Sequence, residues 1–222
     1  DLFLLPGITA SLLDSNIDGR GHPFILGVTT PGMGSLQDAL KAATTRGADL
    51  SKVSKEWEAR ANLMTFGDAV LAKIRSLAVG ERAKRSMVHK WRSSQPDTLS
   101  NADARRTADS VIGKKNSVYF EWDLCRVREG YFRLKPGIDY CIQRARAYSP
   151  HADLIWMETG KPGIPDAKRF SDGVKKAFPH QMLAYNLSPS FNWDATFSKE
   201  KRMKQFSTRL AEVGFNLQFM TL

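Results

Sequence analysis

The sequence contains only two cysteines, Cys125 and Cys141, and no run of the roughly 18 consecutive apolar residues that a membrane-spanning helix requires. Because a chain of 222 residues can bury a core without disulfide bonds, two cysteines predict reduced thiols in an intracellular compartment. Neither end carries a recognisable targeting signal: the start lacks the basic segment of an export signal, and the last three residues match no peroxisomal or retention sequence. These absences favour an intracellular globular protein and argue against a membrane protein.

Metal-ligand spacing is also missing, since the four histidines lie far apart and no acidic residues or histidines form a recognised ligand motif. Positive charge, by contrast, is in excess: 33 lysines and arginines outnumber 23 aspartates and glutamates, which gives a formal net charge of +10. Many of these residues lie between positions 82 and 115: Arg82, Lys84, Arg85, Lys90, Arg92, Arg105, Arg106, Lys114 and Lys115. Such a surface can contact nucleic acid, an anionic substrate or an oligomer partner. It lacks interleaved aromatics for base stacking, and a solvated helix face is the simpler interpretation.

Composition divides the chain near Ser117 into a polar front half and an apolar back half. Between residues 36 and 77 the apolar residues recur largely at helical spacing, which predicts two or three helices, with Gly80 closing the last pattern. Ser100 is a suitable N-cap for a further helix over residues 101–112, and Gly113 is a suitable stop. We therefore predict a small helical module in this half.

The back half contains three short apolar runs of buried-strand length, at residues 153–157, 182–186 and 217–221. Apolar residues at helical spacing separate them: Phe170, Val174 and Phe178, then Met203, Phe206, Leu210 and Val213. A further helix over residues 138–148 precedes the first run. Alternating strands and helices imply parallel pairing through right-handed crossovers, as in a doubly wound sheet or a barrel.

Polar side chains stand at the ends of these predicted strands, where the functional groups of parallel α/β proteins gather. Glu158 follows the first strand, Asn186, Ser188 and Ser190 follow the second, and Thr221 ends the third. Alternate residues of an extended segment face the same side, so the amide and hydroxyls predict a neutral cradle for a carboxylate. Glu158 could then orient a metal-bound water or polarise a hydroxyl.

Simpler structural interpretations stay open for the same residues. Glu158 can be a solvated loop acid, and the segment around Pro189 can be a polar turn without a ligand. Cys125 has basic neighbours that could lower its pKa, but a structural thiol is the plainer interpretation.

Several strings resemble the eukaryotic isocitrate lyases, in the order in which they occur in that family. They are residues 15–18 (SNID), 22–27 (HPFILG), 126–133 (RVREGYFR), 152–158 (ADLIWME) and 183–193 (LAYNLSPSFNW). The resemblance extends from about residue 9 to the end of the chain. The helical region resembles the insertion of the glyoxysomal and fungal members.

The resemblance implies an α/β fold, the last strands of an (α/β)8 TIM-type barrel with an inserted helical subdomain. Its domains would be residues 1–27 (partial barrel), 28–117 (helical insertion) and 118–222 (C-terminal barrel). It also implies Mg2+-dependent cleavage of isocitrate to succinate and glyoxylate by a homotetramer in a glyoxysome, peroxisome or mitochondrion. By the same resemblance Asn186, Ser188, Ser190 and Thr221 bind succinate, Glu158 lies near the metal and glyoxylate, and Trp156 is its neighbour in the substrate site.

Other parts of the family pattern are missing from the sequence. The Lys-Lys-Cys-Gly-His signature with its proposed acid, the Mg2+-binding acids and the Ala-Arg-Thr-Asp motif are absent, so the chain resembles an incomplete enzyme, which we expect to be inactive alone. An alternative within the resemblance is 2-methylisocitrate lyase, which forms pyruvate and succinate. An alternative of another class is a non-enzymatic module that interacts through its basic helices. We expect small-molecule ligands, with neither nucleic acid nor a membrane as partner.

Overall fold

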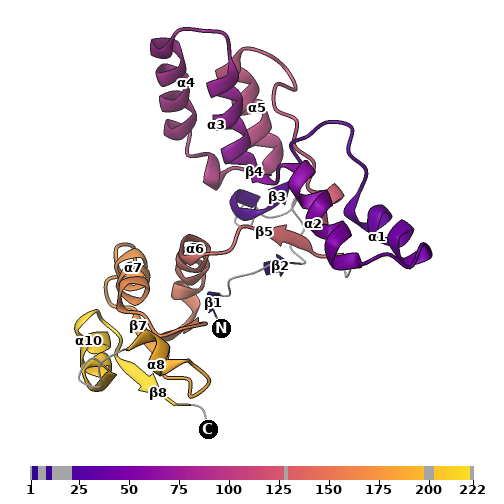
Figure 1. The fold of residues 1–222 in the computed structure, drawn as a ribbon. Coiled ribbons are helices and arrows are strands. Elements are labelled where there is room, and N and C mark those ends of the chain that lie inside the picture. Colours follow the sequence, from indigo (N-terminus) through magenta and orange to yellow (C-terminus); the bar gives the residue numbers. More distant parts are fainter. Residues whose placement is uncertain (1, 5–8, 12–21, 128–129, 198–202, 221–222) are drawn as a thin grey trace. The chain divides into compact units, whose positions relative to one another are not determined.

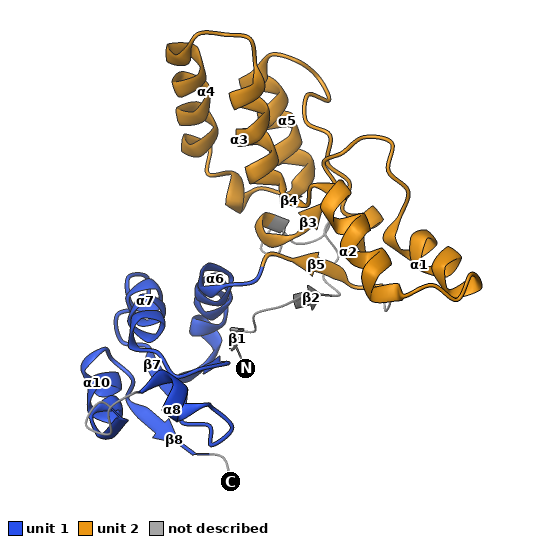
Figure 2. Cartoon of the chain, in the orientation of Figure 1, with its two compact units in different colours: residues 1–7, 136–222 blue, residues 8–135 orange. Residues whose placement is uncertain are grey.

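The computed structural model describes residues 2–4, 9–11, 22–127, 130–197 and 203–220. The chain forms two compact units, coloured separately in Figure 2. The sheet unit comprises Asp1–Gly7 and Pro136–Leu222, and the helical unit comprises Ile8–Lys135. The predicted insertion, residues 28–117, falls wholly within the helical unit.

The sheet unit is built on four parallel strands in the order β1-β6-β7-β8 (Figure 1). They are β1 (Leu2–Leu4), β6 (Leu154–Thr159), β7 (Met182–Asn186) and β8 (Leu217–Phe219). Its helices are α6 (Ile138–Tyr148), α7 (Ile164–Lys175), α8 (Trp193–Thr196) and α10 (Phe206–Glu212), with the 3-10 turn η4 (Ser149–His151). The predicted alternation of strands and helices is confirmed. Successive strands β6, β7 and β8 are direct neighbours, without the reversal of order that marks a doubly wound sheet.

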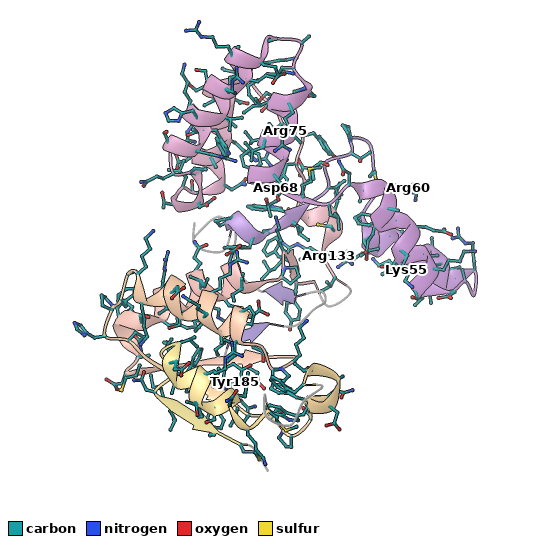
Figure 3. All side chains as sticks on the ribbon, turned by 60° about the vertical axis from the view of Figure 1, so that its left-hand side comes forward. Lys55, Arg60, Asp68, Arg75, Arg133 and Tyr185 are labelled. Atoms are coloured by element: carbon teal, nitrogen blue, oxygen red, sulfur yellow. The ribbon has the colours of Figure 1, made fainter. Side chains whose placement is uncertain are left out.

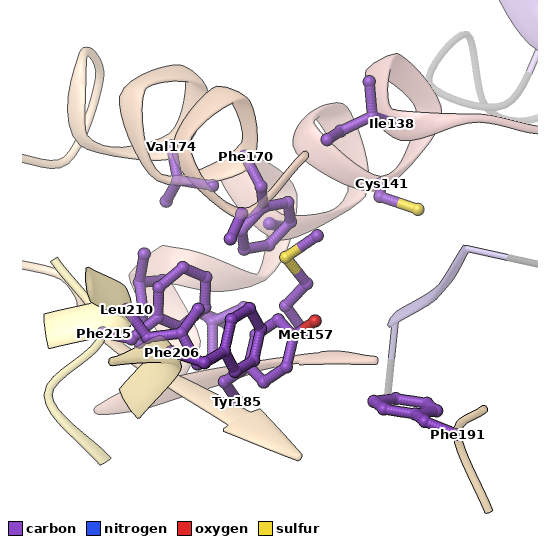
Figure 4. Packing of buried hydrophobic residues seen from close by; sticks show 14 residues of the cluster. Ile138, Cys141, Met157, Phe170, Val174, Tyr185, Phe191, Phe206, Leu210 and Phe215 are labelled. Atoms are coloured by element: carbon purple, nitrogen blue, oxygen red, sulfur yellow. The ribbon is translucent and has the colours of Figure 1, made fainter. Parts of the chain in front are cut away.

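The core of the sheet unit lies between one face of the sheet and the helices α6, α7 and α10 (Figure 4). Ile155 and Met157 of β6, with Leu183 and Tyr185 of β7, point into this core because alternate strand residues share a face. Phe170 of α7, which is fully buried, packs among them. The intervening strand residues, including Trp156, Glu158 and Asn186, therefore lie on the opposite face of the sheet.

One predicted helix ends earlier than its apolar spacing indicates. The helix α7 stops at Lys175, and Phe178 lies beyond it, with its amide donating to the carbonyl of Val174 at 3.0 Å. Pro179 follows at once and disfavours the helical conformation of the residue before it, which prevents another turn.

Within the described residues the helical unit contains five α-helices, two short strand pairs and two isolated β-bridges. Its helices are α1 (Leu36–Thr45), α2 (Leu50–Ala61), α3 (Phe66–Ser76), α4 (Glu81–Ser93) and α5 (Asn101–Ile112), with 3-10 turns η1 (His22–Phe24), η2 (Pro96–Thr98) and η3 (Asp123–Cys125). The strand β2 (Thr9–Ser11) pairs with β5 (Phe132–Leu134), and β3 (Leu26–Gly27) pairs with β4 (Met64–Thr65), both antiparallel. The predicted helical module is thus present.

Helix ends in this unit follow the capping residues closely. Ser100 accepts a hydrogen bond from the Asp103 amide and begins α5, while Gly113 ends it in the left-handed conformation at φ 79°, as predicted. The prediction for Gly80 is wrong, because α3 already ends at Ser76. The next residue, Leu77, has an extended ψ of 140°, and Gly80 instead precedes α4.

Aromatic rings, the partly buried Arg105 and the buried Arg133 hold the helical unit together. Phe66 makes edge-on contacts with Trp91 and Phe120, with ring centroids 6.1 and 5.4 Å apart. Arg105 lies over the Phe66 ring at 5.4 Å and donates to the carbonyl of Phe120. Arg133, labelled in Figure 3, is 4% exposed and pairs with Glu58 at 2.8 Å. Such a buried ion pair helps to fix how the side chains pack, in addition to the attraction between its two charges.

Candidate active site

The candidate residues gather at the carboxyl ends of β6 and β7, on the sheet face away from the helices. The register places Trp156 beside Ala184, which brings Glu158 level with Asn186 two residues further along. The Asn186 amide nitrogen donates to a Glu158 carboxylate oxygen at 3.3 Å. Glu158 is therefore half-buried in contact with Asn186 instead of being an isolated loop acid.

The two serines lie together in the loop that follows β7. Their hydroxyl oxygens are 2.7 Å apart, and the Ser190 amide donates to the Ser188 hydroxyl at 3.2 Å. The indole N–H of Trp193 donates to the Ser188 carbonyl at 3.0 Å and fixes this turn. Ser188 is buried while Ser190 is exposed, so the pair extends from the sheet face to solvent. The predicted juxtaposition of these serines is present, in a turn around Pro189.

Two polar atoms on this sheet face are buried without a hydrogen-bond partner among the described residues: Trp156 Nε1 and Asn186 Oδ1. A buried donor without a partner costs about 1–3 kcal/mol, so such atoms are rare unless a ligand or water satisfies them. The Trp156 ring is held by an edge-on contact with Phe219 of β8, with centroids 5.1 Å apart. The Leu187 amide donates to the Phe219 carbonyl at 2.7 Å, which ties the ends of β7 and β8 together.

Thr221 lies outside the described residues, so its predicted place at this edge stays a prediction. The strand β8 ends at Phe219. Tyr185, which the sequence interpretation did not single out, acts from the opposite face of β7. Its hydroxyl lies 3.0 Å from the Thr159 hydroxyl, which in turn donates to the Lys161 carbonyl at 2.8 Å. Burial raises the pKa of Tyr185, and the hydrogen bond with Thr159 offsets only part of that rise.

Tyr185 therefore links the carboxyl ends of β6 and β7 from within the core and positions the loop that follows Glu158 (Figure 3). The strand alternation places Tyr185 on the apolar face, which is why polarity alone did not identify it. The only available signal was a tyrosine among otherwise aliphatic core positions, since a buried hydroxyl requires a partner.

The cysteines do not take part in this cluster. Burial raises the pKa of the Cys125 thiol to about 11 and that of the Cys141 thiol to about 11, although nearby arginines lower both. Cys125 also donates to the Leu26 carbonyl at 3.1 Å within the helical unit. The structural interpretation of Cys125 is therefore favoured over a reactive thiolate.

The donors at this edge do not by themselves form a magnesium site. Within the described ranges no three His, Cys, Asp or Glu side chains lie close enough to hold a metal, and Glu158 is the one carboxylate at the ends of β6 and β7. Magnesium prefers six oxygen ligands, several of which can be water or substrate.

Comparison with known proteins places the sequence in a family. A model of the isocitrate lyase family matches residues 7–222. The chain belongs to the isocitrate lyase family. It is 40% identical to an isocitrate lyase of Pinus taeda over 222 residues, which covers 97% of this chain and 38% of that protein. An isocitrate lyase of Saccharomyces cerevisiae is 39% identical over 218 residues, covering 96% of this chain and 38% of that protein.

A mitochondrial 2-methylisocitrate lyase of Hypocrea atroviridis is also similar, at 34% identity over 214 residues, covering 95% of this chain and 37% of that protein. The chain thus spans less than two fifths of the length of these curated relatives. The names of these relatives refer to two different substrates, so family membership alone does not assign a substrate to this chain.

Proposed function

We propose that this chain forms the succinate-binding side of an isocitrate lyase active site. The observation that carries the proposal is the unpaired, buried indole N–H of Trp156 on the same sheet face as Asn186 and Glu158. A carboxylate only accepts hydrogen bonds, so it is the matching partner for an indole N–H and for serine hydroxyls. The hydroxyls of Ser188 and Ser190 share one hydrogen bond at 2.7 Å, so the pair leaves one further O–H donor for the ligand.

The remaining unpaired atom is an acceptor and serves a different part of the ligand. Because Asn186 Nδ2 donates to Glu158, Asn186 Oδ1 is left to accept a hydrogen bond from the ligand, for example from a hydroxyl or a protonated carboxyl group. Glu158 places a negative charge beside the cradle, which disfavours a second carboxylate at that point. Thr221 is proposed as a further succinate ligand at the end of the third strand.

The reaction proposed for the protein to which this segment contributes is a retro-aldol cleavage. A base takes the hydroxyl proton of isocitrate, the C–C bond breaks to give glyoxylate, and the electron pair left on the adjacent carbon delocalises into the neighbouring carboxylate. An acid then protonates that carbon to give succinate, and we propose that the base and the acid are supplied by residues outside this cluster. Donors aimed at that carboxylate stabilise the charge as it develops. Trp156, Ser188 and Ser190 perform this role, while Glu158 orients the reacting hydroxyl region. Mg2+, the proposed cofactor of the family reaction, would be held mainly by residues outside this cluster.

The same proposal accounts for the architecture. The strands β6, β7 and β8 follow one another in order with all packed helices on one face, which supports the last part of an (α/β)8 barrel. The remaining face carries exposed Leu154, Met182 and Leu217, residue types that fill barrel interiors. We propose residues 1–27 and 118–222 as barrel segments, residues 28–117 as the insertion, and a homotetramer in a glyoxysome, peroxisome or mitochondrion.

The test is binding of succinate to the purified 222-residue chain by calorimetry, together with assays for glyoxylate from isocitrate and pyruvate from 2-methylisocitrate in the presence of Mg2+. We expect succinate binding, with no product from either substrate by this chain alone. The double variant Ser188→Ala/Ser190→Ala should lose binding, whereas Lys168→Ala, on the exposed side of α7, should retain it.

Absence of succinate binding by a folded chain would contradict the proposed cradle. Release of glyoxylate or pyruvate would instead contradict the expected inactivity and would choose between the two substrates. The two lyases differ by one methyl group in the substrate, which is worth roughly 10–200-fold in specificity.

A further inference from the structure

The helix α4 presents a basic face to solvent that the proposed lyase function does not use. Arg82, Arg85, His89 and Arg92 recur at spacings of three, four and three residues, which places them on one side of a helix. All four are exposed, whereas Trp91 on the opposite side is 2% exposed and packs against Phe66. The outward side of α4 is thus fixed by the packing of Trp91.

The charge of this face is not neutralised within the described residues. Glu81 is the single acidic residue of α4, and it pairs with Lys84 at 3.2 Å. Arg82, Arg85 and Arg92 form no ion pair with any described residue. Four positions from Arg82 to Arg92 span about 15 Å at the rise of an α-helix. The result is a row of exposed basic side chains along α4, whose positive charge at neutral pH comes from the three arginines.

An exposed apolar turn lies at the end of this surface where α4 begins. Residues 77–80 join α3 to α4, and Val79 in this turn is 41% exposed. Arg75 in the last turn of α3 is exposed as well, so basic residues flank the turn on both sides. Figure 1 shows the turn as the connection between α3 and α4 at one end of the helical unit.

We propose that the outward face of α4, with Val79 at its end, docks on an anionic lipid surface. Lipid headgroups supply the negative charge that complements the arginines, and Val79 can enter the interfacial region beside them. This face offers no aromatic ring on which nucleic acid bases could stack, because the one aromatic residue of α4, Trp91, is buried. No described helix is long and apolar enough to cross a membrane, and a surface contact needs none. This proposal departs from the expectation of no membrane partner, which stays a prediction until the experiment below is done.

The experiment is co-sedimentation of the full 222-residue chain with vesicles. Vesicles of phosphatidylcholine with about one third phosphatidylserine should bind the chain, and pure phosphatidylcholine vesicles should not. Raising NaCl from about 50 to about 500 mM should release it, because screening shortens the range of the attraction. Arg82→Glu/Arg85→Glu should weaken binding about tenfold or more, and Val79→Asp about threefold.

The matched control is Lys41→Glu/Arg46→Glu, which makes the same charge change in the same unit, at an exposed position of α1 and at the exposed residue that follows its last turn. The affinity of this control for vesicles should stay within about twofold of that of the unmodified chain. An equal loss of affinity in both double variants would mean that binding depends on net charge alone, and it would overturn the proposal. Tighter binding of duplex RNA than of vesicles, unaffected by Val79→Asp, would also overturn it in favour of a phosphate-backbone partner. Circular dichroism of each variant shows whether lost binding reflects lost folding, and the salt and lipid dependence of the unmodified chain tests the proposal independently.

Discussion

The two units of this chain use their polar residues in opposite ways. In the sheet unit, polar side chains gather toward the carboxyl ends of β6 and β7, where buried atoms of Trp156 and Asn186 have no hydrogen-bond partner among the described residues. In the helical unit, unpartnered atoms of Asn101 and Arg133 belong to side chains that are otherwise held by Arg105 and Glu58. Unsatisfied polarity beside donors at strand ends indicates a ligand site, whereas the same feature inside a closed helical core indicates structure.

The largest expected effect separates the two faces of the sheet. Phe170→Ala removes a fully buried ring from the face covered by helices and should lower the free energy of unfolding by about 3–5 kcal/mol. Met182→Ala, on the opposite face and 46% exposed, should cost less than about 1 kcal/mol. Urea denaturation followed by circular dichroism measures both. Equal losses would mean that the second face is also covered in solution.

A second comparison lies within the helical unit. Arg133→Ala leaves Glu58 without its 2.8 Å partner and should lower the free energy of unfolding by about 2–3 kcal/mol, near the lower end for a broken buried pair because Glu58 is partly exposed. The measurement is again urea denaturation. A loss no greater than that of an exposed ion pair would contradict a structural role for this arginine.

Trp156→Phe distinguishes a functional unpaired atom from a structural one. The substitution keeps the ring that contacts Phe219 and removes only the unpartnered N–H, so the free energy of unfolding should stay the same or rise slightly. Succinate affinity should fall about tenfold, which corresponds to one lost charge-assisted hydrogen bond. Thermal denaturation and calorimetry measure the two quantities. Unchanged affinity would remove Trp156 from the cradle.

The smallest effect concerns the exposed pair of Lys135 and Asp68, 2.8 Å apart. Lys135→Ala should cost about 0.5 kcal/mol or less near neutral pH. Burial raises the pKa of Asp68, but hydrogen bonds from Lys135 and Thr65 lower it further, so the net shift is downward. Asp68 therefore contributes to the free energy of unfolding above its ordinary pKa of 3.8. That contribution is lost as the pH falls through the lowered pKa of the folded state.

Urea denaturation of this variant at pH 7 and in acid checks the sign. The difference between Lys135→Ala and the unmodified chain should shrink as the pH falls. A difference that grows in acid would contradict the assignment of a lowered pKa to Asp68.

Local patterns predicted the elements better than the contacts between them. The apolar runs before Glu158 and Asn186 predicted parallel strands, and Ser100 and Gly113 predicted both ends of α5, because these signals act within a few residues. The strands β2 and β5, of three residues each, were too short for alternation to be seen. The resemblance to isocitrate lyases supplied the family, which the family comparison confirms.

The contacts of the candidate site depend on strand register, which the sequence does not reveal. The hydrogen bond between Asn186 and Glu158 joins residues 28 positions apart, and the contact of Trp156 with Phe219 spans a greater distance along the chain. Tyr185 escaped notice because its face of β7 is otherwise aliphatic. The positions of polar residues at predicted strand ends indicated which residues lie close together. The strand register then determined which of their atoms form hydrogen bonds.

The most direct test of the central claim is a nuclear magnetic resonance titration of the 15N-labelled chain with succinate, observing the indole N–H signals of its five tryptophans. Trp156→Phe assigns one signal, and Trp57, Trp91 and Trp122 of the helical unit serve as internal controls. The account predicts a saturable shift of the Trp156 indole signal while those three signals stay in place. An unmoved Trp156 signal in a folded chain, or equal shifts of all five, would contradict a succinate cradle at this sheet edge.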